Sequence, residues 1–285
     1  MTGRITALTA VTLVTTFLII SCGKKEHRNI SVAGSTTIDP FMRKAANSFS
    51  RKHNVTIDIS AVGSKAGIDA LLRGECDIAM SSMEMLPEQV AVAKQKGISI
   101  KPFLLGYDII VPIVHPANQV SDISFSDLKE VFAKSKQQWS DLGGADTIID
   151  VVDRTDASGT FAVWHHYVAP ATVNEEAYTI ERSNSAVLAY VSSHTNAIGY
   201  VSAAYLNPEV KALKLDGIAM TEGDSLLSEY HLKRPLFLYV DEEKFDETEK
   251  LFIIYMIISE AGKELLRESG FFYNSWAGQY HPELP

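Results

Sequence analysis

Arg154 lies in a segment whose residue types and spacing suit the binding of an anion. It comes four residues before Ser158, which opens the run Ser158-Gly159-Thr160, so a turn can bring the guanidinium and the hydroxyls to the same point. A guanidinium offers a rigid fork of N–H donors that matches a tetrahedral oxyanion. Asp156 lies between them and could hold Arg154 in position; the alternative is a surface arginine beside a surface aspartate. The segment therefore predicts an oxyanion-binding loop.

Two further loops share this design, in which an apolar run is followed by hydroxyl side chains, a nearby glycine and a helix. They are Gly34-Ser35-Thr36-Thr37 and Gly63-Ser64-Lys65. The first turn of a helix has free N–H groups and the positive end of the helix dipole, and serine and threonine hydroxyls add donors. These residues are also ordinary helix N-caps, which is the alternative for any single loop. Three such loops in one chain, one of them with an arginine, favour an anion site.

The elements that must position these loops are typical of an α/β protein with mostly parallel strands, because short apolar runs alternate with amphipathic helical stretches. We expect strands at 30–33, 55–62, 77–80, 107–115, 148–152, 197–201 and 234–240. We expect helices from Pro40, after Lys65, over 125–133, from Phe161, over 247–258 and after Glu260. The strands 107–115 and 234–240 would cross between two lobes and form a hinge with a ligand cleft. Lobe 1 is predicted to comprise residues 30–108 plus 234–285, and lobe 2 residues 109–233.

Composition and the histidines argue against nucleic-acid binding and catalysis. The formal net charge is −9 without a basic cluster, so an anion must be bound by local donors rather than by the overall field. A rival function is a hydrolase with Ser158 as nucleophile and His165, His166 or His194 as its base. The segment lacks the glycine two residues before the serine that a nucleophile elbow needs, and no His/Asp cluster has metal-ligand spacing. We therefore expect no enzyme activity, no cofactor and no metal site.

Several segments, in order along nearly the whole mature chain, resemble the phosphate-binding protein family of the high-affinity phosphate importer. They are 33–37, 63–64, 74–82, 128–144, 154–160, 197–201 and 234–236. The resemblance implies a two-lobed type II periplasmic-binding-protein fold that closes on phosphate by a hinge of two crossing strands. It also implies a monomer that binds inorganic phosphate in the cleft and delivers it to the permease subunits of an ABC importer.

The family's ligand positions transfer to this chain residue by residue. The implied phosphate-binding residues are Thr36, Thr37, Ser64, Ser82, Arg154, Ser158, Gly159 and Thr160, with Ser35, Ser81 and Asp156 as weaker candidates. Two positions depart from the family: some members have a carboxylate at the position of Ser82, and many have arginine at that of Met83. Phosphate carries an O–H near neutral pH and sulfate does not, so rejecting sulfate requires a fixed acceptor, for which Asp156 or a serine oxygen are candidates. The alternatives are a binding protein for sulfate, molybdate or another tetrahedral oxyanion, and a phosphate-sensing protein.

The N-terminal segment resembles a bacterial lipoprotein signal. Arg4 precedes a short uncharged run, 5–20, which ends in a lipobox-like Ile19-Ile20-Ser21-Cys22. We expect residues 1–21 to be a signal peptide and 22–29 to be the anchor and tether, with lipid on Cys22; the alternative is an uncleaved membrane anchor. The protein would then be exported and held at a bacterial membrane, facing the periplasm or the cell exterior. Cys76 lies in a stretch flanked by apolar runs, which favours a small buried side chain there rather than a reactive thiol.

Overall fold

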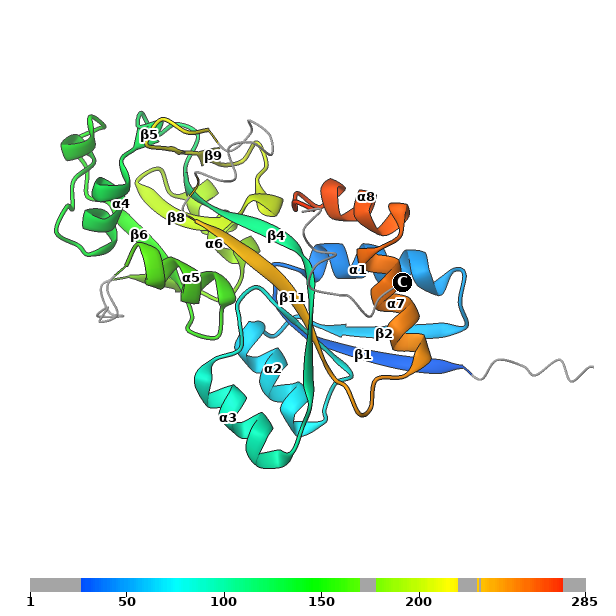
Figure 1. The fold of residues 1–285 in the computed structure, drawn as a ribbon. Helices are drawn as coiled ribbons and strands as arrows, with labels where there is room; N and C mark the ends of the chain where they lie inside the picture. The colour runs from blue at the N-terminus through cyan, green and yellow to red at the C-terminus, as the bar shows by residue number, and fades with distance from the viewer. Residues whose placement is uncertain (1–26, 170–177, 220–229, 231, 274–285) are drawn as a thin grey trace, which may run out of the picture.

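The chain folds as a series of alternating strands and helices, and the computed structural model describes residues 27–169, 178–219, 230 and 232–273 (Figure 1). The helices are α1 (Asp39–Ser50), α2 (Ser64–Arg73), α3 (Pro87–Lys96), α4 (Phe125–Phe132), α5 (Gly159–Tyr167), α6 (Asn184–Ser193), α7 (Glu247–Ile257) and α8 (Glu260–Glu268). The strands are β1 (Arg28–Gly34), β2 (Val55–Ser60), β3 (Ile78–Ser81), β4 (Ile100–Val114), β5 (Asp122–Ile123), β6 (Asp150–Arg154), β7 (Thr179–Glu181), β8 (Ala197–Ser202), β9 (Lys211–Ala212), β10 (Lys214–Leu215) and β11 (Lys233–Asp241). Short 3-10 helices cover Trp139–Leu142 and Ala203–Tyr205.

Most of the strands join one mixed sheet in the order β2-β1-β3-β11-β4-β8-β6-β7, with β9 also paired to β4. β2, β1 and β3 are parallel, and so are β8, β6 and β7. β4 and β11 run antiparallel to each other and to their neighbours β8 and β3. The strands within each half are thus parallel, as expected, and the antiparallel pairs lie at the centre of the sheet. The reason is that β4 leaves one half of the sheet and β11 returns to it, so the two run in opposite directions.

The strands β4 and β11 connect two separate hydrophobic cores. β4 pairs with β11 from Ile100 to Ile109 and then with β8 from Ile110 to Val114, so one continuous strand crosses between the halves. The buried members of two hydrophobic clusters all lie within 30–108 or 234–285, and those of two others lie within 109–233. Figure 1 shows α1, α7 and α8 over one face of the first half, and α2 and α3 over the other. Each predicted lobe thus contains its own core.

Local sequence signals explain the helices that begin at the loops of lobe 1. In α1 the side chains of Phe41, Ala45 and Phe49, which recur every four residues, are buried and pack the helix against the sheet. α2 ends at Gly74, whose φ of 73° is a left-handed conformation that glycine adopts without strain. Both helices therefore begin close to the predicted positions.

Cys76 is a buried thiol, as predicted. It is 8% exposed and packs in a cluster with Ile68 and Leu71. Burial raises the pKa of the Cys76 thiol to about 12, so the reactive thiolate is not formed at neutral pH. The predicted signal peptide, 1–21, and the lipidation site, Cys22, lie outside the described residues. Within the described part of the chain, no helix has the length and apolar character needed to cross a bilayer.

Glu249 is a buried carboxyl group in the first turn of α7, beside the start of β1. Burial raises the pKa of Glu249 to about 7 and the charge of Asp246 adds to the rise, although Arg28 donates a hydrogen bond to the carboxylate at 3.0 Å. Folding raises the pKa of Glu249 from 4.5 to about 7, so the protonated carboxyl group favours the folded state. This contribution to the free energy of unfolding is fully present below pH 4.5 and is lost as the pH rises through about 7.

Glu249→Gln should remove this pH dependence while preserving the packing of the side chain. We expect the free energy of unfolding of the wild type, relative to this variant, to fall by up to about 3 kcal/mol between roughly pH 4.5 and 8. Urea unfolding of both proteins across this range measures the difference. A difference that stays constant with pH would contradict the assignment, because the other titrating groups are common to both proteins.

Candidate functional site

The candidate site lies where the carboxyl ends of strands from both halves of the sheet meet. β1, β2 and β3 are adjacent and parallel, so their loops lie at one edge, and the loops after β6 and β7 approach from the other half. Ligands of open α/β sheets bind beyond the carboxyl ends of the strands. The three predicted loops follow β1, β2 and β6. The loops after β3 and β7 complete the site.

Arg154 is the last residue of β6, two residues beyond the predicted end of that strand, and it is 1% exposed. Its guanidinium donates to Asn184 Oδ1 at 3.3 Å, to Thr36 Oγ1 at 3.3 Å and to the Arg182 carbonyl at 3.1 Å. These acceptors are neutral, and Arg154 Nε has no partner among the described residues. Burial lowers the pKa of Arg154 to about 10, so it is still charged at pH 7. A buried cation held by neutral groups is a site that a bound anion would complete.

Three serine hydroxyls from the loops of lobe 1 form a buried chain opposite α5. Ser35 Oγ donates to Ser82 Oγ at 3.1 Å, and Ser64 Oγ lies 3.2 Å from Ser82 Oγ. The Ser82 N–H donates to Ser64 Oγ at 3.1 Å. A Cβ atom placed on Gly159 would lie 2.5 Å from Ser82 Oγ and 2.6 Å from Ser64 Oγ. The two lobes therefore touch here, and a side chain at the start of α5 would displace these hydroxyls from their present positions.

Threonines form a second contact between the lobes. Thr37 Oγ1 and Thr160 Oγ1 are 3.3 Å apart and both residues are 1% exposed. Tyr205 donates a hydrogen bond to the Thr36 carbonyl at 2.5 Å, and burial raises the pKa of Tyr205 to about 12. With the arginine and serine contacts, these bonds show a closed arrangement of the cleft.

Ser158 is the N-cap of α5 and explains why this helix begins at Gly159, two residues before the predicted Phe161. Its hydroxyl oxygen accepts the N–H groups of Thr160 at 3.1 Å and of Phe161 at 3.3 Å. The capping role does not exclude a ligand contact, because the hydroxyl hydrogen is not used by these bonds.

Ser81 and Asp156, two of the three weaker candidates, form no hydrogen bond to Arg154 or to the serine chain among the described contacts. Ser81 Oγ donates to the Met83 carbonyl at 2.7 Å and accepts the Met83 N–H at 3.3 Å, so it stabilises the turn after β3. Asp156 is exposed, whereas Arg154 is buried and is held by Asn184, Thr36 and a carbonyl group. The expectation that Asp156 positions Arg154 is thus not met. A short turn between them leaves Asp156 on the solvent side.

Sequence reasoning missed three buried residues of the site: Asn184, Arg234 and Asp108. Asn184 Nδ2 donates to Thr37 Oγ1 at 3.0 Å, and Arg234 Nη2 donates to the same oxygen at 3.0 Å. Arg234 also forms an ion pair with Asp108 at 2.7 Å. Burial raises the pKa of Asp108 and lowers that of Arg234, and the ion pair opposes both shifts.

Signals for two of these residues were present in the sequence. Asn184 follows Ser183 at the start of a helix that comes soon after a strand, which is part of the pattern of the three predicted loops, although this segment has no nearby glycine. Arg234 lies in the segment 234–236, which belongs to the family resemblance. Asp108 lies within an apolar strand. From the sequence alone, a buried and ion-paired aspartate at this position cannot be distinguished from one that faces solvent.

The histidines do not lie beside Ser158 as a hydrolase would require. His165 Nε2 is 2.8 Å from Asp153 Oδ2, and Tyr200 donates to the other oxygen of Asp153 at 2.5 Å. Burial, followed by the Asp153 charge, raises the pKa of Tyr200. His194 Nδ1 is 2.8 Å from the Tyr190 carbonyl. His165 thus contacts β6 through Asp153, and His194 contacts the last turn of α6.

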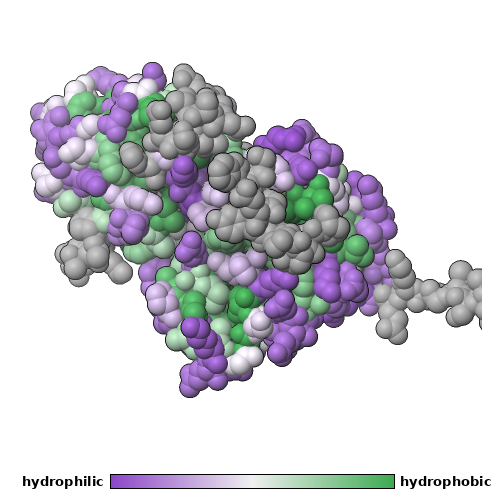
Figure 2. Space-filling model, viewed as in Figure 1, coloured by the Kyte–Doolittle hydropathy of each residue, from purple (hydrophilic) through white to green (hydrophobic). Residues whose placement is uncertain are grey.

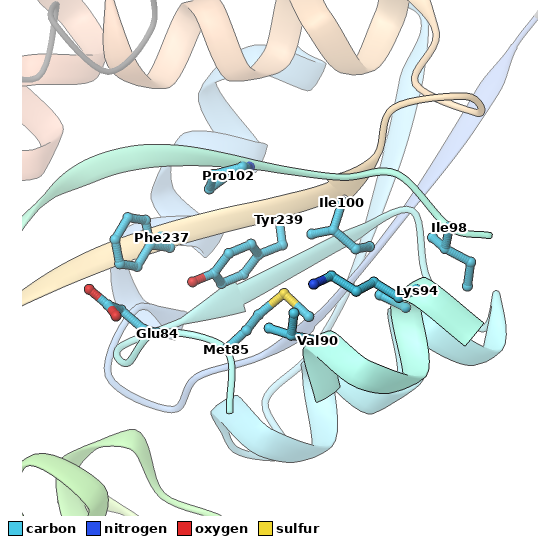
Figure 3. Close-up of a pocket in the computed structure, with 10 residues that line it drawn as sticks. Glu84, Met85, Val90, Lys94, Ile98, Ile100, Pro102, Phe237 and Tyr239 are labelled. Atoms are coloured by element: carbon cyan, nitrogen blue, oxygen red, sulfur yellow. The ribbon is translucent and has the colours of Figure 1, made fainter. Parts of the chain in front are cut away.

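A surface pocket of about 510 Å³ lies elsewhere in lobe 1, between α3 and the strands β4 and β11 (Figure 3). Most of its lining is apolar, with Met85, Phe237 and Tyr239 pointing into it, and Glu84 and Lys94 at its margin. Figure 2 shows apolar surface in the same region, where α2 and α3 lie. Such a lining offers too few donors for a small hydrated anion. The buried cluster around Arg154 is therefore the better candidate for an oxyanion site.

Comparison with known proteins places the chain among solute-binding proteins. The model of the PBP superfamily domain matches residues 21–260. The phosphate-binding protein PstS of Borreliella burgdorferi is 24% identical over 91% of this chain and 95% of its own length. PstS of Bacillus subtilis is 27% identical over 87% of this chain and 81% of its own length.

Comparison with solved structures also places the chain among solute-binding proteins. A Clostridium perfringens protein assigned as a phosphate ABC transporter substrate-binding protein, with bound phosphate, is 31% identical with a TM-score of 0.79. The match covers 87% of this chain and 100% of that one. An ABC-type phosphate transport receptor from Vibrio cholerae is 27% identical with a TM-score of 0.68, covering 86% of this chain and 100% of that one.

These matches confirm the predicted fold, because they extend over both halves of the sheet and the crossing strands. The family consists of substrate-binding transport proteins, not enzymes, so the hydrolase alternative is wrong. On the family model and the 31% identity over most of the sequence, the chain belongs to the PBP (periplasmic-binding-protein) superfamily, among the phosphate ABC transporter substrate-binding proteins.

Proposed function

We propose that this protein binds inorganic phosphate in the closed cleft between lobe 1 and lobe 2 and delivers it to the permease of an ABC importer. The observation that carries the proposal is the buried Arg154 guanidinium, which has neutral partners and an unpaired Nε. Thr36 Oγ1 accepts a hydrogen bond from this guanidinium, and Asn184 connects it to Thr37, whose hydroxyl lies beside that of Thr160. We include the hydroxyls of Ser64, Ser82 and Ser158 in the proposed site, because Ser64 and Ser82 lie opposite the start of α5 and Ser158 caps that helix. The PstS relatives and the Clostridium perfringens protein are described as binding phosphate.

The number of donors is sufficient for tight binding. Hydrogen bonds to a charged group contribute about 1.5–3 kcal/mol each, and a micromolar dissociation constant corresponds to about 8 kcal/mol. Half a dozen such bonds offset the cost of immobilising the ligand and the two lobes. Because the ligand would contact both lobes, its binding free energy favours the closed state over the open one.

A second candidate ligand is another tetrahedral oxyanion, such as sulfate or molybdate. The observation that favours it is the serine at position 82, whose hydroxyl can either donate or accept, whereas a carboxylate could only accept the phosphate O–H. A serine chain therefore discriminates less strongly between protonated and unprotonated anions than a carboxylate would.

Calorimetric titration of residues 23–285 with phosphate, sulfate and molybdate tests the function. We expect tight one-to-one binding of phosphate that excess sulfate does not displace. Equal binding of sulfate would favour the second candidate. No binding of any of the three anions would contradict the proposal, provided that the protein unfolds cooperatively and is therefore folded.

The cellular role includes further proposals. Proteins of this family act outside the cytoplasm, and we propose that lipid on Cys22 tethers this one to the membrane through residues 22–29, as a monomer. The division into lobes at residues 108/109 and 233/234 is supported by the separate hydrophobic cores. Cys22→Ala should move the protein from the membrane fraction to the soluble fraction. Retention in the membrane would favour the uncleaved anchor.

A further inference from the structure

Thr37 Oγ1 receives two N–H donors from opposite sides of the cleft. Arg234 Nη2 on β11 and Asn184 Nδ2 at the start of α6 each lie 3.0 Å from this oxygen. A hydroxyl oxygen has two lone pairs, so both of its acceptor positions are used. The hydroxyl hydrogen must then point away from Arg234 and Asn184, and in this structure Thr160 Oγ1 is 3.3 Å away.

Both donors are themselves held in place by further bonds. Arg234 Nε and Nη2 donate to Asp108 Oδ2 at 2.9 and 2.7 Å, and Ser202 Oγ donates to Asp108 Oδ1 at 2.6 Å. Asn184 Oδ1 accepts Arg154 Nη1 at 3.3 Å and the Ser202 N–H at 3.2 Å. With its oxygen occupied by donors, the Asn184 amide cannot flip without losing both bonds. The nitrogen therefore faces Thr37.

This polar network, defined as Asp108, Arg234, Thr37, Asn184 and Arg154, joins the crossing strands to the site. Asp108 lies on β4 and Arg234 on β11, at the point where the two strands pair between the lobes. Its members are at most 1% exposed, so water competes little for their hydrogen bonds. An ion pair buried this deeply adds little to stability compared with apolar side chains of the same volume, which makes a specific positioning role the better account of its presence.

We propose that Arg234 is a positioning residue which, together with Asn184, fixes the Thr37 hydroxyl as a hydrogen-bond donor to the bound oxyanion. The inference rests on the proposed function. It fixes the hydrogen-bonding role of the ligand oxygen beside Thr37, which must be an unprotonated acceptor. A protonated ligand oxygen is left to the serine chain of Ser35, Ser64 and Ser82, whose hydroxyls can exchange donor and acceptor roles.

A double-mutant cycle tests the proposal, with phosphate affinity measured by calorimetry. Arg234→Gln is made in the wild type, in Thr37→Val and in Thr37→Ser. We expect it to weaken phosphate binding about tenfold in the wild type and in Thr37→Ser, which keeps the hydroxyl, but less than about twofold in Thr37→Val. Equal losses in all three backgrounds would overturn the proposal, because Arg234 would then act directly or through general structure.

The stability of the variants must be separated from their affinity. Arg234→Gln leaves the Asp108 carboxylate buried without its cation, so Asp108→Asn is added to each member of the cycle if the single variant unfolds below the assay temperature. Thermal unfolding of each ligand-free protein reports the structural effect. Because wild-type binding of phosphate is measured in the same series, absence of that binding refutes the proposed function, whereas additive losses refute only the role of Arg234.

Discussion

Arg154→Met is expected to weaken phosphate binding at least tenfold, and about 100-fold if two charge-assisted hydrogen bonds to the ligand are lost. The fold should remain intact. Arg154 is buried against neutral acceptors, so its charge adds little to the stability of the ligand-free protein. The methionine variant also avoids the free-energy cost of burying a charge. We expect the free energy of unfolding without ligand to stay within about 1 kcal/mol of the wild type.

Calorimetry and urea unfolding measure the two effects separately. The matched control is Arg43→Met on α1, because Arg43 is exposed and pairs with Asp39 on the same helix. That variant should bind phosphate as the wild type does. If Arg154→Met also left the affinity unchanged, Arg154 would not be part of the site, and the argument from its buried charge would be wrong.

Gly159→Ala is expected to weaken binding at least 100-fold by preventing closure. The added methyl group would lie 2.5 Å from Ser82 Oγ and 2.6 Å from Ser64 Oγ, well inside van der Waals contact. Gly159 is not among the residues with positive φ, so alanine fits the backbone, and it is the better helix former at the start of α5. The clash therefore acts on the contact between the lobes and leaves each lobe folded.

Small-angle scattering with and without phosphate distinguishes this mechanism from a local defect. The wild type should become more compact when phosphate binds, whereas the variant should keep the larger radius of gyration. Gly97→Ala is the matched control, because Gly97 has φ of 67° with open space around it. It should lower stability by about 1 kcal/mol without changing affinity. Normal compaction of Gly159→Ala on phosphate addition would contradict the closure mechanism.

The loops of the site were predictable because their signals are local. A strand followed by glycine, serine and threonine before a helix places hydroxyls and free N–H groups at one point whatever the rest of the fold does. In the structure Thr37 lies beside Thr160, and Ser64 beside Ser82. The crossing strands β4 and β11 also overlap the predicted strands 107–115 and 234–240. The prediction that Asp156 holds Arg154 in position was wrong, because proximity in sequence does not determine which side of a turn faces solvent.

The central antiparallel pairing and the polar network were not predictable in this way. Asp108 and Arg234 are far apart in sequence, and their ion pair exists only because β4 and β11 are paired in one register. The direction of the Thr37 hydroxyl depends on Asn184 as well, from a third segment. Nothing in any one segment indicates that these three side chains converge.

Sequence alone determined the fold family, the loops and the central cation, because each depends on the order of residues within a short segment or a series of such segments. The tertiary structure decided which hydroxyls face one another, which residue needs to lack a side chain, and how Arg154 is held without a carboxylate. The physical reason is that hydrogen bonds and steric contacts act over a few ångströms between groups whose separation along the chain is set only by the packing of the whole sheet.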